Sequence, residues 1–271
     1  MTTENSKPIV LDRFKLKENL KENFVAYLDV LGFSELVNSK NSAADLDSYF
    51  SKITDELEDI RQTDPSNKIQ SLLISDSIIL IAPKGLDGLK LLINTVRRIQ
   101  SALVWRKIIL RGGISFGEVF YDETHNIIVG KGYIKAYKLE TLATYPRVII
   151  DPAIIKLVAE DKVAFLKAVN GTLEYNDKRK VYVPSEFSKI QEDGIFVDYS
   201  NKTIRNNDIN NNIKSVYEVI KNNLYTHQGL FQKYIWLRDY FLECMKLTES
   251  LATNQKHKKD INVWIEKFER L

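Results

Sequence analysis

Cysteines, histidines and long apolar runs are scarce in this sequence, and each absence excludes a class of protein. The single cysteine, Cys244, cannot form a disulfide within the chain, and the three histidines lack the CxxC or HxxxH spacing of the usual zinc sites. No segment approaches the roughly 18 apolar residues of a membrane span, and the N-terminus has no basic stretch followed by an apolar run. We therefore expect a cytoplasmic protein without a membrane partner.

Neither sign of charge dominates the chain. Thirty-nine Lys and Arg residues oppose 36 Asp and Glu residues, and the two signs are interspersed along the sequence. A nucleic-acid partner is therefore not expected, because no basic patch stands out. With 271 residues, 44% of them hydrophobic, the chain is long enough to bury a core without disulfide or metal staples.

The first 150 residues alternate between strand-like and helix-like apolar patterns. Residues 24–31 (FVAYLDVL) predict a buried strand, and two apolar runs within residues 69–82 predict a β-hairpin with Asp76 at its turn. Apolar residues spaced by three and four predict amphipathic helices over 46–60 and 86–103. A strand over 108–114, a hairpin over 119–129, a helix over 133–139 and a strand over 147–150 follow. This βαββαβ order with an extra hairpin predicts a ferredoxin-like α+β domain.

The pattern changes after an asparagine-rich segment near residue 206. Before it, residues 180–183 and 195–199 look like strands, and after it residues 213–220, 230–247 and 261–271 have helical periodicity. We predict a catalytic-type domain over residues 1–205 and a C-terminal helical region over 206–271. The aromatic residues of 225–241 are expected to pack on the sheet or at an interface between subunits.

Two carboxylates interrupt the apolar strands, at Asp29 and Asp76. Taken singly, Asp76 is an ordinary turn residue and Asp29 a cap for the turn that follows it. Taken together they indicate a site, since the first and third strands of a split βαβ unit lie side by side and would bring both residues to one place. Two carboxylates there would suit Mg²⁺ or Mn²⁺.

A tight turn follows Asp29 directly. Gly32, Phe33 and Ser34 lead from the strand into a helical segment, so their backbone N–H groups are expected to face an anion. A metal-bound triphosphate fits that arrangement. The glycines of RGGISFG could suggest a second phosphate loop, but no GK[ST] accompanies them.

Four segments together resemble the class III nucleotide cyclases. LDVLGFSEL is similar to the family's FxDIxGFT segment, SDSIIL to its GDxxxxxF hairpin, LRGGISFGEV to its RxGIxxG strand, and GKGYIKAYKLE to its GxxVNxAxRxE helix. The resemblance implies a homodimer with composite active sites. It also implies two metal ions on Asp29, Asp76 and the main-chain carbonyl of Val30, and attack of the ribose 3′-oxygen on the α-phosphate with loss of pyrophosphate.

The chain departs from that family at the residues that read the base and the ribose. Leu72 and Ile127 stand where the family has its adenine-selecting lysine and partner aspartate, and Ile134 stands where it has its ribose-orienting asparagine. The transition-state arginine is Lys138, which keeps the charge without the planar fork. These departures leave open a purine cyclase with another base pocket, and an inactive cyclase-fold protein that binds nucleotides.

One branch of the family accommodates these departures. Tyr27 shares the strand face of Asp29, since side chains alternate along a strand. In the family the equivalent position lines the base pocket of the other subunit's site, so the resemblance implies that an aromatic ring here could fill the space of a purine. The GxxYxxAxxLE form of the helix, DGIFVDY and KYIWLRDYF resemble the Pycsar pyrimidine cyclases of bacterial antiphage defence. That resemblance implies UTP or CTP as substrate, cUMP or cCMP as second messenger, and a downstream effector that the cyclic nucleotide activates. Lys138 then joins Asp29 and Asp76 as catalytic. Tyr27, the Gly32–Ser34 turn and Arg111 would bind substrate, although an arginine on a strand more often forms a surface ion pair.

Overall fold

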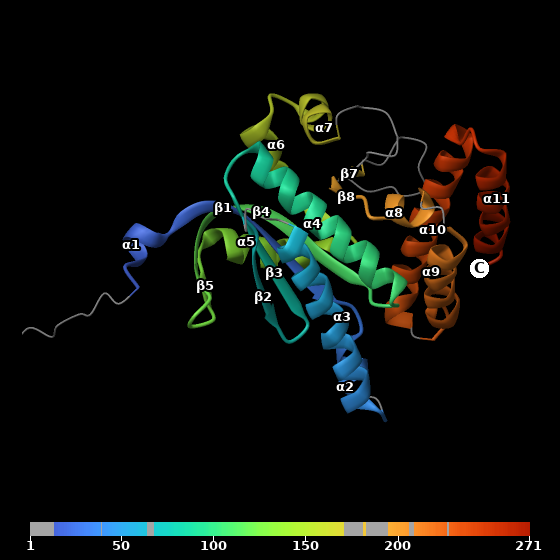
Figure 1. Ribbon diagram of the computed structural model, residues 1–271, viewed down its shortest axis with the longest axis horizontal. Helices are drawn as coiled ribbons and strands as arrows, with labels where there is room; N and C mark the ends of the chain where they lie inside the picture. Colours follow the sequence, from blue (N-terminus) through green and yellow to red (C-terminus); the bar gives the residue numbers. More distant parts are fainter. Residues whose placement is uncertain are drawn as a thin grey trace, which may run out of the picture.

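The computed structural model describes residues 14–38, 40–63, 68–170, 181–182, 195–205, 209–226 and 228–271. Within these residues the chain forms a sheet with helices on both faces and a group of helices at one end (Figure 1). A short helix, α1 (Leu16–Asn19), precedes the sheet.

The first strand lies in the middle of the sheet. β1 (Lys21–Val30) pairs antiparallel with β3 (Ser77–Pro83) on one side and with β4 (Leu110–Asp122) on the other. β2 (Gln70–Ile74) forms a hairpin with β3, so these four strands lie in the ferredoxin-like order β2-β3-β1-β4. β6 (Val148–Ile150) runs parallel to β4, and β8 (Phe196–Val197) and β7 (Val181–Tyr182) extend that edge, which makes the sheet mixed. β5 (Ile127–Val129) pairs with the far end of β4. The predicted α+β fold is confirmed.

Both faces of β1 are buried, because helices cover both sides of the sheet. Phe24, Ala26 and Leu28 pack in one cluster with α3 (Ser42–Thr63) and α4 (Leu86–Trp105). Val25 and Tyr27 point to the opposite face, where they pack with α5 (Lys131–Ala143). The near-continuous apolar run of this strand reflects its burial on two sides.

The glycines of RGGISFG permit close packing of α5 on β4. A Cβ at Gly113 would lie 2.3 Å from Leu139 Cβ, and one at Gly117 would lie 3.0 Å from the backbone nitrogen of Gly132. No side chain fits at the first of these positions without displacing α5. These glycines therefore serve helix packing, and the phosphate-loop interpretation is not needed to explain them.

The C-terminal helices share a core with the sheet. α9 (Ile209–Asn223), α10 (Gln228–Leu251) and α11 (Gln255–Glu269) stand together at one end of the molecule (Figure 1). Their buried residues form one cluster with Val104 of α4, with Ile109 just before β4, and with Phe196 of β8. The boundary near residue 206 stays a prediction, and residues 206–208 lie outside the described ones. No described helix is long and apolar enough to cross a membrane.

Several elements differ in extent from the sequence-based prediction. β4 continues to Asp122, well past its predicted end at residue 114, and the strand predicted over 195–199 is limited to Phe196–Val197. The helix α8 (Ser200–Arg205) was not predicted, because its sequence SNKTIR has no apolar periodicity. Only Val181–Tyr182 of the strand predicted over 180–183 are described. α2 (Phe33–Val37), α6 (Pro152–Val158) and α7 (Lys162–Asn170) complete the fold.

Candidate active site

Asp29 and Asp76 come together at one end of the sheet. Asp29 lies opposite Ser77 in the β1–β3 register, and Asp76 directly precedes Ser77 in the turn of the β2–β3 hairpin. Ser75, with φ 56°, takes the left-handed conformation that closes this turn. Val30, the last residue of β1, is buried beside them. The structure therefore brings both predicted carboxylates to one place, while their binding of metal stays a prediction.

Arg111 and Glu140 complete a charged cluster around Asp29. On β4, Arg111 lies opposite Asp29, and its Nε and Nη2 atoms both donate to Asp29 Oδ2 at 3.3 Å. The same Nε lies 2.5 Å from Oε1 of Glu140, a buried residue of α5. Of the two roles weighed for Arg111, the ion pair is the one that the structure shows.

The cluster holds more negative than positive charge. Burial, then the charges of Glu140 and Asp76, raise the pKa of Asp29 from 3.8 to about 6, while Arg111 acts in the opposite direction. A charge-assisted hydrogen bond is normally about 2.7–2.9 Å long, so the 3.3 Å contacts to Arg111 leave Asp29 weakly neutralised.

A hard divalent cation suits this donor set. Carboxylate oxygens are the preferred ligands of Mg²⁺ and Mn²⁺, and a cation between Asp29 and Asp76 would remove the repulsion that raises the pKa of Asp29. Among the described residues, no three His, Cys, Asp or Glu side chains gather into a metal site. An ion held by these two aspartates would therefore need further oxygen ligands, such as those of a bound phosphate.

The turn after β1 opens to solvent at Gly32 and Ser34. Gly32 has φ 85°, a left-handed conformation that favours glycine, and it leads into α2. Phe33, predicted to bind substrate, directs its ring into the core against Tyr49, with ring centroids 5.3 Å apart. Only the backbone of Phe33 is therefore available for the role that the sequence suggested.

Tyr27 lies on the same sheet face as Asp29, as the strand alternation predicted. Its Oη lies 2.6 Å from Ser77 Oγ, and its ring contacts Tyr133 and Tyr137 of α5 at centroid distances of 6.1 and 5.3 Å. Leu72 packs in the same cluster. This arrangement is an aromatic wall beside the carboxylates, and its contact with a base stays a prediction.

Lys138 and Ile134 lie on the exposed face of α5. Ile134 and Tyr137 are each 50% exposed and Leu142 is 66% exposed, whereas Glu140 faces the sheet. Positions two apart on a helix face opposite ways, so Lys138 is directed away from the cluster that Glu140 joins. Within one chain the structure does not bring Lys138 to Asp29. Ile127, on β5, is half-buried at the far end of β4.

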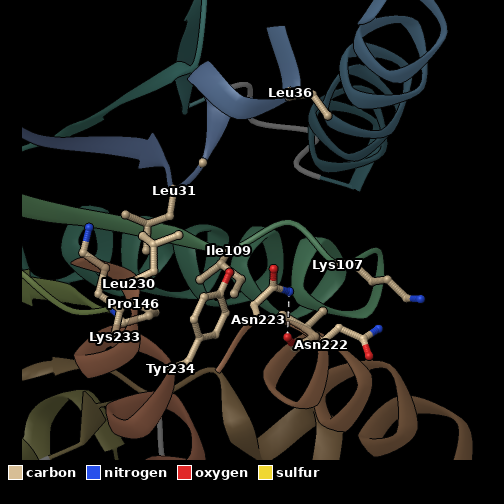
Figure 2. A pocket seen from close by; sticks show the side chains of 12 residues that line it. Leu31, Leu36, Lys107, Ile109, Pro146, Asn222, Asn223, Leu230, Lys233 and Tyr234 are labelled. Atoms are coloured by element: carbon tan, nitrogen blue, oxygen red, sulfur yellow. Dashed lines mark hydrogen bonds between the residues drawn. The ribbon is translucent and has the colours of Figure 1, made fainter. Parts of the chain in front are cut away.

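A cavity of about 350 Å³ lies between the turn after β1 and the C-terminal helices. Figure 2 shows Leu31 and Ile109 on the sheet side, and Asn223, Lys233 and Tyr234 on the helix side. The Lys233 side chain extends from α10 toward the sheet. Burial, then the neighbouring charge of Arg111, lowers the pKa of Lys233, while Asp29 and Glu140 act in the opposite direction. The helical region thus supplies a cation to the surroundings of the cluster.

Glu140 and Lys233 belong to the site although neither was predicted from the sequence to have a role. Glu140 ends the segment GKGYIKAYKLE, four residues after the buried Ala136, and this spacing places it on the buried face of α5. Lys233 lies one turn before Leu237 within an apolar helical pattern. In both cases the available signal was a charge on the apolar face of a helix.

Neither a family model nor a curated protein matches this sequence. Solved structures of nucleotide cyclases are similar to it at low identity. The catalytic core of a rhodopsin-guanylyl cyclase with converted specificity, in complex with ATPαS, has 13% identity and a TM-score of 0.46 over 66% of this chain and 96% of that one. The guanylyl cyclase Cya2 has 13% identity and a TM-score of 0.41 over 65% of this chain and 90% of that one. A bacterial light-regulated adenylyl cyclase has 13% identity and a TM-score of 0.42 over 74% of this chain and 58% of that one. Similarity of this extent assigns no activity to the chain.

Proposed function

We propose that this chain is a nucleotide cyclase of the class III type that converts UTP or CTP to cUMP or cCMP and pyrophosphate. The observation that carries the proposal is the convergence of four motif segments on one site. LDVLGF ends β1 with Asp29, SDSIIL forms the hairpin with Asp76, LRGGISFGEV is β4 with Arg111, and GKGYIKAYKLE is α5 with Glu140. Segments that resemble one family in sequence thus meet around one pair of carboxylates.

In this proposal Asp29, Asp76 and the Val30 carbonyl hold two Mg²⁺ or Mn²⁺ ions. When bound, these ions would neutralise the triphosphate and favour the ionised 3′-hydroxyl. Arg111 holds the Asp29 carboxylate from one side and is itself held by Glu140. The backbone of the Gly32 turn binds phosphate oxygens beside them. The 3′-oxygen bonds to the α-phosphorus, the bond to the bridging oxygen breaks with its electron pair leaving in pyrophosphate, and the hydroxyl proton is released to solvent.

Base selection is proposed to depend on the wall around Tyr27. Leu72 is apolar and buried in that wall, and the ring of Tyr27 occupies space on the sheet face that carries Asp29. A pyrimidine is one ring smaller than a purine, so it is the base expected to fit there. In the cell the product would serve as an antiphage second messenger that activates a downstream effector.

The first experiment identifies the product. The purified chain is incubated with Mn²⁺ and each of ATP, GTP, CTP and UTP, and the products are identified by mass spectrometry. We expect cUMP or cCMP as the main product, and none from the Asp29→Ala control. Cyclic AMP or GMP as main product would support the purine alternative, and absence of any cyclic nucleotide would support the inactive alternative.

The active unit is proposed to be a homodimer that uses the exposed face of α5. Ile134, Tyr137 and Leu142 expose large apolar area there, beside the solvent-exposed Lys138. A two-fold interface through this face would bring Lys138 of one subunit to the metal-binding strand end of the other. Mixing Asp29→Ala with Lys138→Ala chains should then restore up to about a quarter of the sites, by random pairing. Heterodimers without rescued activity would show that each site is built from one chain.

A further inference from the structure

We propose that Lys233, from the C-terminal helix α10, is a polyphosphate-binding residue, and that the cavity it lines holds the β- and γ-phosphates of the substrate and then the released pyrophosphate. The proposal rests on the proposed cyclase function for the identity of the substrate. The chemistry of the cavity supports polyphosphate binding independently of turnover.

The lining of the cavity is suited to an anion. Of the described residues around it, none is acidic, and Lys107, Lys233, Asn222, Asn223 and Tyr234 carry hydrogen-bond donors. Its volume of about 350 Å³ lies within the roughly 300–1,000 Å³ of small-molecule sites. The lining itself therefore carries donors and no carboxylate, although Asn223 Nδ2 donates to the Val219 carbonyl and Lys107 pairs with Glu218.

The two lysines of the cavity differ in their partners. Lys107 is exposed and pairs with Glu218 at 3.0 Å, and in Figure 2 it extends outward at the far end of the lining. Lys233 is half-buried, and in the described part of the chain no carboxylate forms an ion pair with it. Burial and the neighbouring Arg111 charge both disfavour its ammonium, and the charges of Asp29 and Glu140 favour it without an ion-pair contact. An anion in direct contact with Lys233 would therefore stabilise the charged form.

The position of the cavity connects it to the charged cluster. Gly32 forms part of its wall, three residues after Asp29. The charges of Asp29, Arg111 and Glu140 all act on Lys233, so its ammonium lies close to the cluster that surrounds the proposed reaction centre. A triphosphate whose α-phosphate lies at Asp29 could extend past Gly32 into this cavity. Charge that builds up on the leaving pyrophosphate would then meet Lys233.

The test measures binding of sodium tripolyphosphate and of pyrophosphate by calorimetry, with the full chain and with Mg²⁺ at fixed concentration. Lys233→Met retains the apolar stem of the side chain and removes the charge. We expect this variant to bind tripolyphosphate at least about tenfold more weakly than wild type. The matched control is Lys246→Met, on the same helix but outside the cavity lining, where Lys246 pairs with Glu269, and it should change the affinity by less than about threefold. Lys233→Arg should retain most of the affinity.

Turnover gives a second readout. In Lys233→Met the KM for the nucleotide should rise about tenfold and inhibition by pyrophosphate should weaken in parallel, while circular dichroism stays unchanged. If Lys233→Met folds and binds tripolyphosphate as wild type does, or if wild type binds none, the inference is wrong. A different outcome separates the two proposals: wild type makes no cyclic nucleotide but binds tripolyphosphate, and Lys233→Met loses that binding. This result would overturn the proposed function and leave the role of Lys233 intact.

Discussion

Two aspartates in different parts of the fold, Asp198 after β8 and Asp29 on the central strand β1, show how differently one side chain can be held. Asp198, fully buried next to β8, accepts hydrogen bonds through Oδ1 from Tyr240 Oη at 2.6 Å, Ser200 Oγ at 2.8 Å and Ser200 N at 3.2 Å. Asp29 is less buried, yet its bonds to Arg111 are 3.3 Å long, and burial followed by the charges of two other carboxylates raises its pKa. The better satisfied carboxylate joins two parts of the fold, and the poorly satisfied one lies where a ligand would bind.

The surroundings of Asp198 support its structural role. The backbone nitrogens of Tyr199 and Ser200 donate to Tyr240 Oη at 3.1 and 3.0 Å, so α10 is tied to the segment that follows β8. Ser101 of α4 donates to the carbonyl of Tyr199. A buried network in which the members satisfy one another is rigid and costly to disrupt.

The largest expected effect is on catalysis. Asp29→Ala and Asp76→Ala should each reduce cyclisation at least about 1,000-fold, which corresponds to roughly 4 kcal/mol at the transition state. Their free energy of unfolding should stay equal to that of wild type or rise, because a poorly satisfied charge is removed. Product formation by mass spectrometry and urea unfolding check both parts. Activity near that of wild type in either variant would contradict the assignment.

At Asp198 we expect the opposite result, a loss of stability without a loss of catalysis. Asp198→Ala leaves Tyr240 Oη and Ser200 Oγ without their acceptor and leaves Ser200 N with Tyr240 Oη alone, so the free energy of unfolding should fall by about 3 kcal/mol. Urea unfolding of the full chain measures this change. Folded Asp198→Ala should retain its nucleotide turnover at low temperature. If the variant is as stable as wild type, the proposed contrast between the two aspartates fails.

Features with a local sequence pattern could be predicted, whereas features that depend on how helices pack could not. β1, the β2–β3 hairpin and α5 have local patterns, and the meeting of Asp29 with Asp76 follows from the neighbouring positions of β1 and β3. Glu140 and Lys233 were missed because a charged residue in a helical pattern is ordinarily on the solvent side, and only the packing of α5 and α10 makes these two face the cluster. The full length of β4 was missed because its glycines look like breaks, whereas they are sites of close approach by α5.

A pH dependence should distinguish Asp29 from a solvated carboxylate. Its pKa is about 6 in the folded chain and 3.8 ordinarily, so between those values the folded state binds more protons and wild-type stability falls as pH rises. Relative to wild type, Asp29→Asn should therefore gain stability from pH 4 to pH 7. The shift in pKa sets an upper bound of about 3 kcal/mol, and the gain should be smaller than this bound because the Asp29 side chain is partly exposed to solvent.

Urea unfolding in EDTA buffer at pH 4 and pH 7 measures that difference. Adding Mn²⁺ at pH 8 should stabilise wild type and leave Asp29→Asn unchanged, since a cation binds the ionised carboxylate. If the difference in free energy of unfolding between wild type and Asp29→Asn is independent of pH, Asp29 is not desolvated.

The smallest effect concerns two tyrosines, one beside each aspartate. Tyr27 bonds to Ser77 and forms the aromatic wall with Tyr133 and Tyr137, whereas Tyr240 bonds to Asp198 in the interior. We expect wild type to turn over UTP or CTP at least ten times faster than ATP or GTP, a preference of only about 1.4 kcal/mol. Tyr27→Ala should narrow this gap, because it removes contacts to a pyrimidine and opens space for a purine. Tyr240→Phe should lower stability by roughly 1 kcal/mol and leave the ratio of kcat/KM values unchanged. Steady-state kinetics with four nucleotides decides the matter: if Tyr27→Ala keeps the wild-type ratio, the ring of Tyr27 does not face the base, even where the metal assignment to Asp29 and Asp76 holds.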